Sequence, residues 1–345
     1  MNNSNRIGFM QGRLSPMING RIQAFPWTHW KDEFPVAEQV GIHLMEWTLD
    51  QDRLYENPLL TEIGQAEIRG LCQRHNLSIP SLTGDCFMQA PLWKASGNMR
   101  ASLERDFHEI AKSCAAVGIS MIVIPLVDNG RLENTEQEDT LVAFLESQSA
   151  FLASHDLKVV FESDFAPVEL ARFISRLDTA LFGINYDIGN SAALGFNPAD
   201  EIAAYGANIV NVHVKDRVLG GTTVPLGTGN ADFEIVFELL EKIKYLGNYI
   251  LQTARSATGM HLEELLLNKT KLTKWLSQAE CGSNKNLTSV RTSGYMKNTL
   301  VELHKPILMD NSQLRKSNEN IGLHFKASES EMQGYPKINN WRIQL

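Results

Sequence analysis

Short runs of apolar residues alternate along the chain with longer amphipathic stretches. The apolar runs are four to eight residues long, and ten to twenty residues separate them. Strands buried on both faces of a parallel sheet give such runs, and the helices that cover the sheet give the amphipathic stretches. The pattern predicts eight strands, at residues 7–10, 43–47, 79–82, 121–125, 159–162, 184–187, 209–214 and 249–252.

Helical spacing of apolar residues is clearest at 98–117, 232–244 and 261–276. Eight strand–helix units favour a closed barrel over an open doubly wound sheet, because no glycine-rich dinucleotide fingerprint follows the first strand. The predicted fold class is therefore α/β, a (β/α)8 TIM barrel with an irregular C-terminal extension.

The alternating pattern ends near residue 280. Asn, Ser and Lys dominate residues 281–345, where neither helical nor strand periodicity is sustained. This segment has 9 Lys and Arg against 5 Asp and Glu, whereas residues 1–280 have 23 against 35. We predict a barrel domain over residues 1–280 and an irregular or disordered tail over residues 281–345, either dispensable or a weakly basic extension for a partner.

Composition excludes several classes of protein. Hydrophobic residues make up 43% of the chain, yet no run approaches the roughly 18 apolar residues of a membrane span. The net charge of −8 argues against a nucleic-acid surface. The N-terminus has no apolar signal core and the four cysteines form no CxxC pair, so we expect a soluble cytoplasmic protein with free thiols.

Four predicted strands end in a polar residue that can bind a metal ion: Glu162, Asp187, His213 and Gln252. The carboxyl ends of parallel barrel strands form one face, so these four side chains are expected to meet there. Two carboxylates and an imidazole suit Mn²⁺, Co²⁺, Mg²⁺ or Zn²⁺, and the sequence does not choose among them. The amide of Gln252 is a weaker ligand. For either carboxylate taken alone, a helix cap or a salt bridge is the alternative role.

Further candidates lie next to these positions. Asn190 follows Asp187 in Asp187-Ile188-Gly189-Asn190 and can donate to a sugar hydroxyl or orient a ligand. Lys215 shares the strand face of His213 and is a catalytic candidate, while Arg217 can clamp a substrate hydroxyl, carboxylate or phosphate. The loop at residues 225–229 either cradles an anion with backbone N–H groups or is a plain turn.

These residues resemble one known family, the xylose isomerase-like TIM barrels of the sugar phosphate isomerase/epimerase superfamily. The resemblance covers about residues 6–278 and is carried by Phe161-Glu162, Asn185-Tyr186-Asp187-Ile188-Gly189-Asn190, Val212-His213-Val214-Lys215-Asp216-Arg217 and Pro225-Leu226-Gly227-Thr228-Gly229. It implies a divalent metal held by glutamate, aspartate, histidine and a second glutamate on the eighth strand. In ketose epimerases of the family, the two glutamates move protons on opposite faces of a metal-bound enediolate.

The resemblance also assigns roles outside the metal ligands. Glu46, in Met45-Glu46-Trp47, matches a family position that faces the substrate and is a catalytic candidate together with Glu162. The opening segment at residues 8–16 is similar to other members, and Gln11 and Arg13 within it are our candidates for substrate binding.

The eighth-strand position departs from the family pattern, because it reads Leu251-Gln252-Thr253. An amide oxygen can coordinate a cation, but an amide cannot accept a proton at neutral pH. A two-base epimerase would lose one base, whereas an aldose–ketose isomerase could use Glu162 or Glu46 alone. Two carboxylates in place of three should also hold the cation more weakly.

The leading hypothesis is a metal-dependent sugar or sugar-phosphate isomerase or epimerase that acts on a small-molecule substrate through a metal-bound enediolate. A dehydratase of polyols or keto-inositols on the same barrel would need the same site but would expel hydroxide. A catalytically degraded, sugar-binding barrel is the non-enzymatic alternative, and AP endonuclease relatives are disfavoured by the acidic barrel and the few histidines. A homo-oligomer is compatible with each hypothesis.

Overall fold

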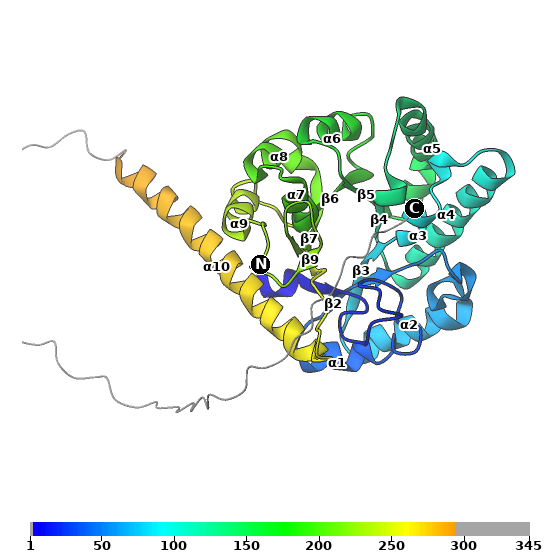
Figure 1. The fold of residues 1–345 in the computed structure, drawn as a ribbon, viewed down its shortest axis with the longest axis horizontal. Helices are drawn as coiled ribbons and strands as arrows, with labels where there is room; N and C mark the ends of the chain where they lie inside the picture. Colours follow the sequence, from blue (N-terminus) through cyan, green and yellow to red (C-terminus); the bar gives the residue numbers. More distant parts are fainter. Residues whose placement is uncertain (1–2, 294–345) are drawn as a thin grey trace, which may run out of the picture. The chain divides into compact units, whose positions relative to one another are not determined.

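Eight parallel strands close into a barrel, and helices surround it (Figure 1). The computed structural model describes residues 3–293, and the burial of residues 5–282. The first and last barrel strands close the sheet through the pairs Ile7–Tyr249 and Phe9–Leu251. In chain order the barrel strands are β1 (Ile7–Met10), β2 (Leu44–Thr48), β3 (Ser78–Thr83), β4 (Met121–Leu126), β5 (Lys158–Ser163), β6 (Phe182–Asp187), β7 (Ile209–Val214) and β10 (Asn248–Leu251).

The fold class predicted from the apolar runs is confirmed. Each predicted strand lies within two residues of an observed one at either end, and the first and seventh have the predicted bounds. The pattern did not indicate the short antiparallel pair β8 (Asp216–Arg217) and β9 (Thr223–Val224), which follows β7.

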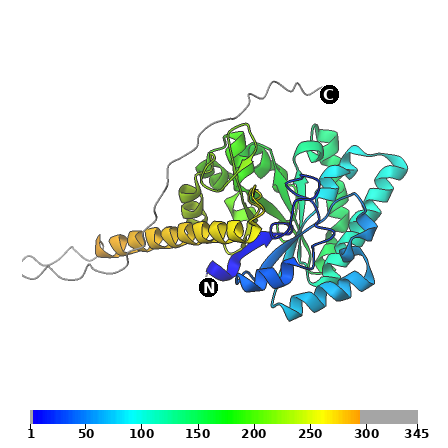
Figure 2. The same ribbon diagram turned by 60° about the horizontal axis from the view of Figure 1, so that its bottom comes forward.

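The α-helices form the outer layer of the barrel (Figure 2). They are α1 (Glu33–Gln39), α2 (Glu62–Arg74), α3 (Asp85–Gln89), α4 (Gly97–Val117), α5 (Thr135–Ser154), α6 (Pro167–Ile174), α7 (Ile188–Leu194), α8 (Pro198–Tyr205), α9 (Phe233–Lys242) and α10 (His261–Ser293). Short 3-10 helices occur at Asn3–Arg6, Leu54–Glu56, Pro58–Leu60, Leu92–Lys94, Asp128–Gly130 and Gly206–Asn208.

The predicted boundary near residue 280 falls inside α10. The helix begins at His261, as expected, and continues to Ser293, past the end expected at residue 276. Leu272 and Leu276 are buried on its inner side, and α10 packs against α9. The rest of the predicted tail, residues 294–345, lies outside the described residues.

The two faces of the barrel sheet have different chemistry. Side chains that point outward pack against the helices, as Phe161 of β5 does against Phe173 of α6 with ring centroids 5.2 Å apart. Side chains that point inward near the carboxyl ends are polar, and Glu46, Asn211 and His213 are fully buried there. The hydrophobic core that stabilises the fold therefore lies mainly between sheet and helices, which leaves the strand ends available for chemistry.

Two expectations from composition can be compared with the structure. The four cysteines form no disulfide, and Cys86 and Cys114 are buried. Among residues 3–293, no helix combines the length and the apolar character that crossing a bilayer requires.

Replacing Phe161 by alanine tests the outer core. Phe161 is fully buried and contacts the rings of Phe173 and Phe182, so Phe161→Ala should lower the free energy of unfolding by about 3–5 kcal/mol. Denaturant unfolding followed by circular dichroism measures the change. Val168→Ala on α6 is the control, because Val168 is 77% exposed and its truncation should cost little. Equal stability of Phe161→Ala and the parent chain would contradict the packing described.

Candidate metal centre and active site at the mouth of the barrel

Three of the predicted metal ligands lie together at the ends of neighbouring strands. Asp187 ends β6, and Glu162 and His213 each lie one residue before the end of their strands, β5 and β7. Asp187 and His213 are register partners. One ligand atom of each lies within 4.8 Å of the others, and all three residues are buried. The parallel sheet therefore gathers these side chains as the strand spacing predicted.

The donor set of these three residues fits a divalent cation. Asp187 begins α7, where its Oδ1 accepts the backbone N–H of Asn190 at 2.9 Å. Its Oδ2 is buried, and the Lys215 ammonium lies 2.5 Å away. Two buried carboxylates and an imidazole nitrogen that lie this close together are a suitable set of ligands for a metal ion.

Glu46 binds His213 across the barrel. The Oε1 atom of Glu46 lies 2.7 Å from His213 Nε2 and also accepts the hydroxyl of Thr83. Its Oε2 accepts from Ser81 Oγ at 2.6 Å and from Asn211 Nδ2 at 3.0 Å. Both oxygens of this fully buried carboxylate are thus engaged, and the arrangement leaves His213 Nδ1 directed at Glu162 Oε2, 3.1 Å away. Glu46 therefore orients the imidazole, as carboxylates beside metal-binding histidines do.

The pKa values of the site follow from burial and from the neighbouring charges. Burial alone would lower the pKa of His213, but the carboxylates of Glu46 and Glu162 outweigh it and raise that pKa to about 10. Burial would raise the pKa of Glu162, but Lys215 and His213 outweigh it and lower that pKa to about 2. Burial raises the pKa of Asp187, and the charge of Glu162 adds to this effect. The proton of the cluster is therefore held on His213 and Glu162 is ionised.

Residues that the sequence reasoning missed complete a polar layer below the ligands. Asn185 Nδ2 donates to Glu162 Oε2 at 3.2 Å, and Asn211 Nδ2 donates to Asn185 Oδ1 at 2.8 Å. Both asparagines precede a ligand by two positions, so alternation along the strand places them on the same inner face. A polar residue two positions before a candidate ligand, inside an apolar run, was the signal that could have found them.

Asn190 and Arg217 extend this network toward the mouth. Asn190 Nδ2 donates to Glu162 Oε1 at 2.5 Å, and its Oδ1 accepts from Arg217 at 2.8 Å. Arg217 also donates through two nitrogens to the carbonyl of Gly221, in the loop between β8 and β9. Gly189 allows this packing, because a Cβ at that position would lie 2.8 Å from Lys215 Cγ. Asn190 thus orients a predicted ligand, which is one of the two roles expected for it.

The loop at residues 225–229 does cradle an anion, and the anion belongs to the chain. The Oδ2 atom of Asp216 accepts the backbone N–H groups of Gly227, Thr228 and Gly229 at 2.8, 3.1 and 2.9 Å. Asp216 is fully buried, and a Cβ on Gly229 would collide with its carboxylate. These amides are therefore already bonded to a carboxylate of the protein.

Gln252 has no hydrogen bond to the other three predicted ligands among the contacts of the described residues. Its Nε2 donates to Gln23 Oε1 at 2.8 Å, and Gln23 Nε2 in turn donates to Asp85 Oδ2 at 2.7 Å. The Gln252 Oε1 atom is buried and accepts no hydrogen bond. Neither Gln23 nor Asp85 was a candidate from the sequence, since Gln23 lies in an irregular segment and Asp85 reads as the first residue of a helix.

The two candidates after β1 differ in their contacts. Gln11 is fully buried, accepts from the backbone N–H of Thr48 at 3.1 Å and leaves its Nε2 without a partner, so it retains a free donor. The guanidinium of Arg13 instead donates to the carbonyls of Thr253 and Ile22. Burial, aided by the nearby Arg255, lowers the pKa of Arg13 to about 9.

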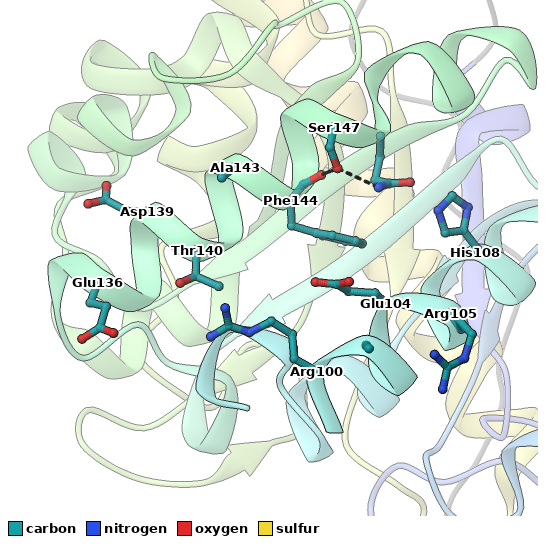
Figure 3. Close-up of a pocket in the computed structure, with 12 residues that line it drawn as sticks. Arg100, Glu104, Arg105, His108, Glu136, Asp139, Thr140, Ala143, Phe144 and Ser147 are labelled. Carbon is teal, nitrogen blue, oxygen red and sulfur yellow. Dashed lines mark hydrogen bonds between the residues drawn. The ribbon is translucent and has the colours of Figure 1, made fainter. Parts of the chain in front are cut away.

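A separate hollow lies outside the barrel, between α4 and α5 (Figure 3). All its lining residues belong to these two helices, among them Arg100 and His108 on α4 and Asp139 on α5. No strand end contributes to it. This hollow is therefore distinct from the site built by the barrel strands.

Glu46→Gln tests the interaction that orients His213. Loss of the carboxylate charge should lower the pKa of His213 from about 10 in the metal-free protein, measured by NMR titration of the imidazole nitrogens. Because that pKa lies above the value of 6.5 for the unfolded chain, the Glu46–His213 pair stabilises the fold fully below pH 6.5. The stabilisation is lost as pH rises through about 10. Glu38→Gln is the control. It removes the carboxylate that contacts His75 and should leave the pKa of His213 unchanged. An unchanged pKa in Glu46→Gln would contradict this account.

Comparisons with known proteins agree with the fold. The sequence model of the family described as xylose isomerase-like TIM barrel matches residues 34–274. L-ribulose-5-phosphate 3-epimerase UlaE of Escherichia coli (strain SMS-3-5 / SECEC) is 25% identical over 233 residues, 65% of this chain and 81% of that protein.

Solved structures with lower sequence identity to this chain share its barrel fold. The 3-keto-D-glucoside 4-epimerase YcjR from E. coli superimposes with a TM-score of 0.56 at 16% identity, covering 77% of this chain and 99% of that one. The IOLI protein with a bound zinc atom gives a TM-score of 0.61 at 17% identity, covering 79% and 99%. Because the family model matches residues 34–274, more than half of the chain, this chain belongs to the xylose isomerase-like TIM barrel family.

Proposed function

We propose that this protein is a metal-dependent sugar isomerase or epimerase that moves a proton on the carbon next to a carbonyl group. The observation that carries the proposal is the buried group of Glu162, Asp187 and His213 at the mouth of the barrel. Two named relatives, UlaE and YcjR, are sugar epimerases, and the IOLI structure contains zinc. We further propose a small-molecule sugar as substrate and the cytoplasm as the compartment, on the evidence of unpaired cysteines.

The metal would be held by Glu162, Asp187 and His213 Nδ1, with Gln252 Oε1 as a fourth, weaker donor. Once bound, a divalent cation would polarise the substrate carbonyl and lower the cost of removing the neighbouring proton. Glu46 would hold the His213 imidazole through the Nε2 atom of the ring, so that His213 Nδ1 stays directed at the other ligands.

The remaining roles concern proton transfer and substrate orientation. Glu162 is ionised, with its pKa lowered to about 2 by Lys215 and His213 despite its burial, so it is available as a base. Its two oxygens are oriented by Asn185 and Asn190. Glu46 takes no part in proton transfer in this proposal, because all its acceptor positions near the site are occupied. Lys215, close to Asp187, would stabilise developing negative charge, and Gln11 Nε2 would donate to a substrate hydroxyl.

Proton exchange tests the reaction. Incubated with Mn²⁺ or Co²⁺ in deuterated water, the protein should replace the proton next to the carbonyl of its sugar with deuterium, as measured by NMR or mass spectrometry. Glu162→Gln should lower the exchange rate at least about 100-fold, because the amide cannot accept the proton. Glu169→Gln, an exposed glutamate on α6, is the control and should exchange normally. Absence of exchange in the parent chain across a broad panel of aldoses, ketoses and their phosphates would refute the proposal.

Metal binding is tested separately from activity. Calorimetric titration of the metal-free protein with Mn²⁺ should show one site, and Asp187→Asn should weaken it at least about tenfold. Gln252→Glu should strengthen binding by adding a negative ligand. Asp200→Asn, on the exposed first turn of α8, should leave the affinity unchanged. Equal affinity of Asp187→Asn and the parent chain would exclude this group as the metal site.

A further inference from the structure

Asp85 is a carboxylate at the mouth of the barrel that the proposed function leaves without a role. It is the first residue of α3, directly after Gly84 and the end of β3, so it lies on the same face of the barrel as the ligands. Its side chain is buried, with 7% of its surface exposed. Gln23 donates to its Oδ2, and no cation contacts it directly among the described residues. A buried carboxylate without a cationic partner needs an explanation.

Two amides connect Asp85 to the eighth-strand position. Gln23 donates to Asp85 through Nε2 and accepts from Gln252 through Oε1, so both ends of the Gln23 amide are fixed. The chain Asp85–Gln23–Gln252 joins the end of β3 to the end of β10, which lie three strands apart around the barrel. Gln252 occupies the position where the family pattern places a second glutamate. A carboxylate is therefore present two hydrogen bonds away from that position, at the start of α3.

The surroundings of Asp85 suit a group that exchanges protons near neutral pH. Burial raises the pKa of Asp85 to about 7, and the carboxylates of Asp50 and Glu162 act in the same direction. Gln23 and Lys215 oppose the rise. Arg13 and Cys86 are also within electrostatic range. Glu162 on β5 and Asp85 after β3 thus give the mouth of the barrel two carboxyl groups, as a base and an acid acting on one substrate require.

We propose that Asp85 is the second proton-transfer residue of this enzyme, in place of the glutamate that residue 252 lacks, and that Gln23 and Gln252 are positioning residues for it. The inference depends on the proposed function. In one direction, Glu162 takes the proton from the carbon next to the carbonyl, and the electrons of the C–H bond form an enediolate. The O–H bond of Asp85 then breaks, its proton goes to the opposite face of that carbon, and the carbonyl re-forms. Solvent reprotonates Asp85 and deprotonates Glu162.

Asp85→Asn separates the two proton transfers. Starting from the epimer that Glu162 deprotonates, the variant should still exchange that proton with deuterated water, within about threefold of the parent rate. Formation of the other epimer should fall at least about 100-fold, because the asparagine amide has no proton to give. Exchange that starts from the other epimer should be lost as well. Asp52→Asn, an exposed residue after β2, is the control and should keep all three rates.

A rescue variant distinguishes this role from a structural one. Asp85→Asn combined with Gln252→Glu places a carboxylate at the eighth-strand position and should restore epimer formation at least about tenfold over Asp85→Asn alone. Two measurements do not depend on turnover. The Mn²⁺ affinity of Asp85→Asn should match that of the parent, and a carboxyl resonance that titrates near pH 7 in ¹³C-aspartate-labelled, metal-free protein should disappear in the variant.

Each other outcome overturns the inference. Epimer formation by Asp85→Asn within about threefold of the parent would show that Asp85 transfers no proton. Equal loss of exchange and of epimer formation, with metal affinity intact, would assign Asp85 to substrate positioning instead. Exchange without any epimer in the parent chain would identify a one-base isomerase and would refute this inference while leaving the proposed function in place. Absence of exchange in the parent chain would refute the proposed function itself.

Discussion

Ionised side chains buried together at the strand ends are the constraint on which the rest of the site depends. Glu46, Glu162, Asp187, His213 and Lys215 are each at most 9% exposed, and a buried charge without a partner costs several kcal/mol. Here each charge has an opposite charge close by. His213 lies between Glu46 and Glu162, and Lys215 lies beside Asp187. Removing His213 would take from Glu46 its cationic partner, and removing Lys215 would take from Asp187 its nearest cation, so the two cations hold the cluster together.

The fold was predictable because its signal is local and repeated eight times. Each strand needs only a short apolar run, and closure of the barrel follows from their number and from the missing dinucleotide fingerprint. The proximity of Glu162, Asp187 and His213 was predictable for the same reason, since a polar residue at the end of an apolar strand has a defined place in a parallel barrel. The end of α10 was not predictable, because its residues after 276 show little apolar periodicity and look like an irregular segment in the sequence.

The roles of individual residues were harder to predict than their positions. Glu46 was expected to face the substrate, but its partner His213 is 167 positions away, and no local pattern reports such a contact. Asp85 was missed because an aspartate in the first turn of a helix is ordinary there and suggests no chemistry. Gln252 was recognised as a departure, yet the sequence could not show that its amide is held by Gln23. Long-range side-chain contacts, not secondary structure, decide these assignments.

The glycine loop after β7 bears on the class of substrate. Phosphate groups in (β/α)8 barrels often bind to backbone amides of the loops after the seventh and eighth strands. In this chain, the carboxylate of Asp216 accepts three N–H groups of the loop, and its other oxygen accepts that of Ala231. A phosphate would have to displace a buried carboxylate that it also repels. Arg217 donates to Gly221 and Asn190, and Arg13 donates to backbone carbonyls. Both guanidinium groups are therefore already engaged within the chain. The amides of this loop and these two guanidinium groups are therefore bonded within the chain and are not free to bind a phosphate.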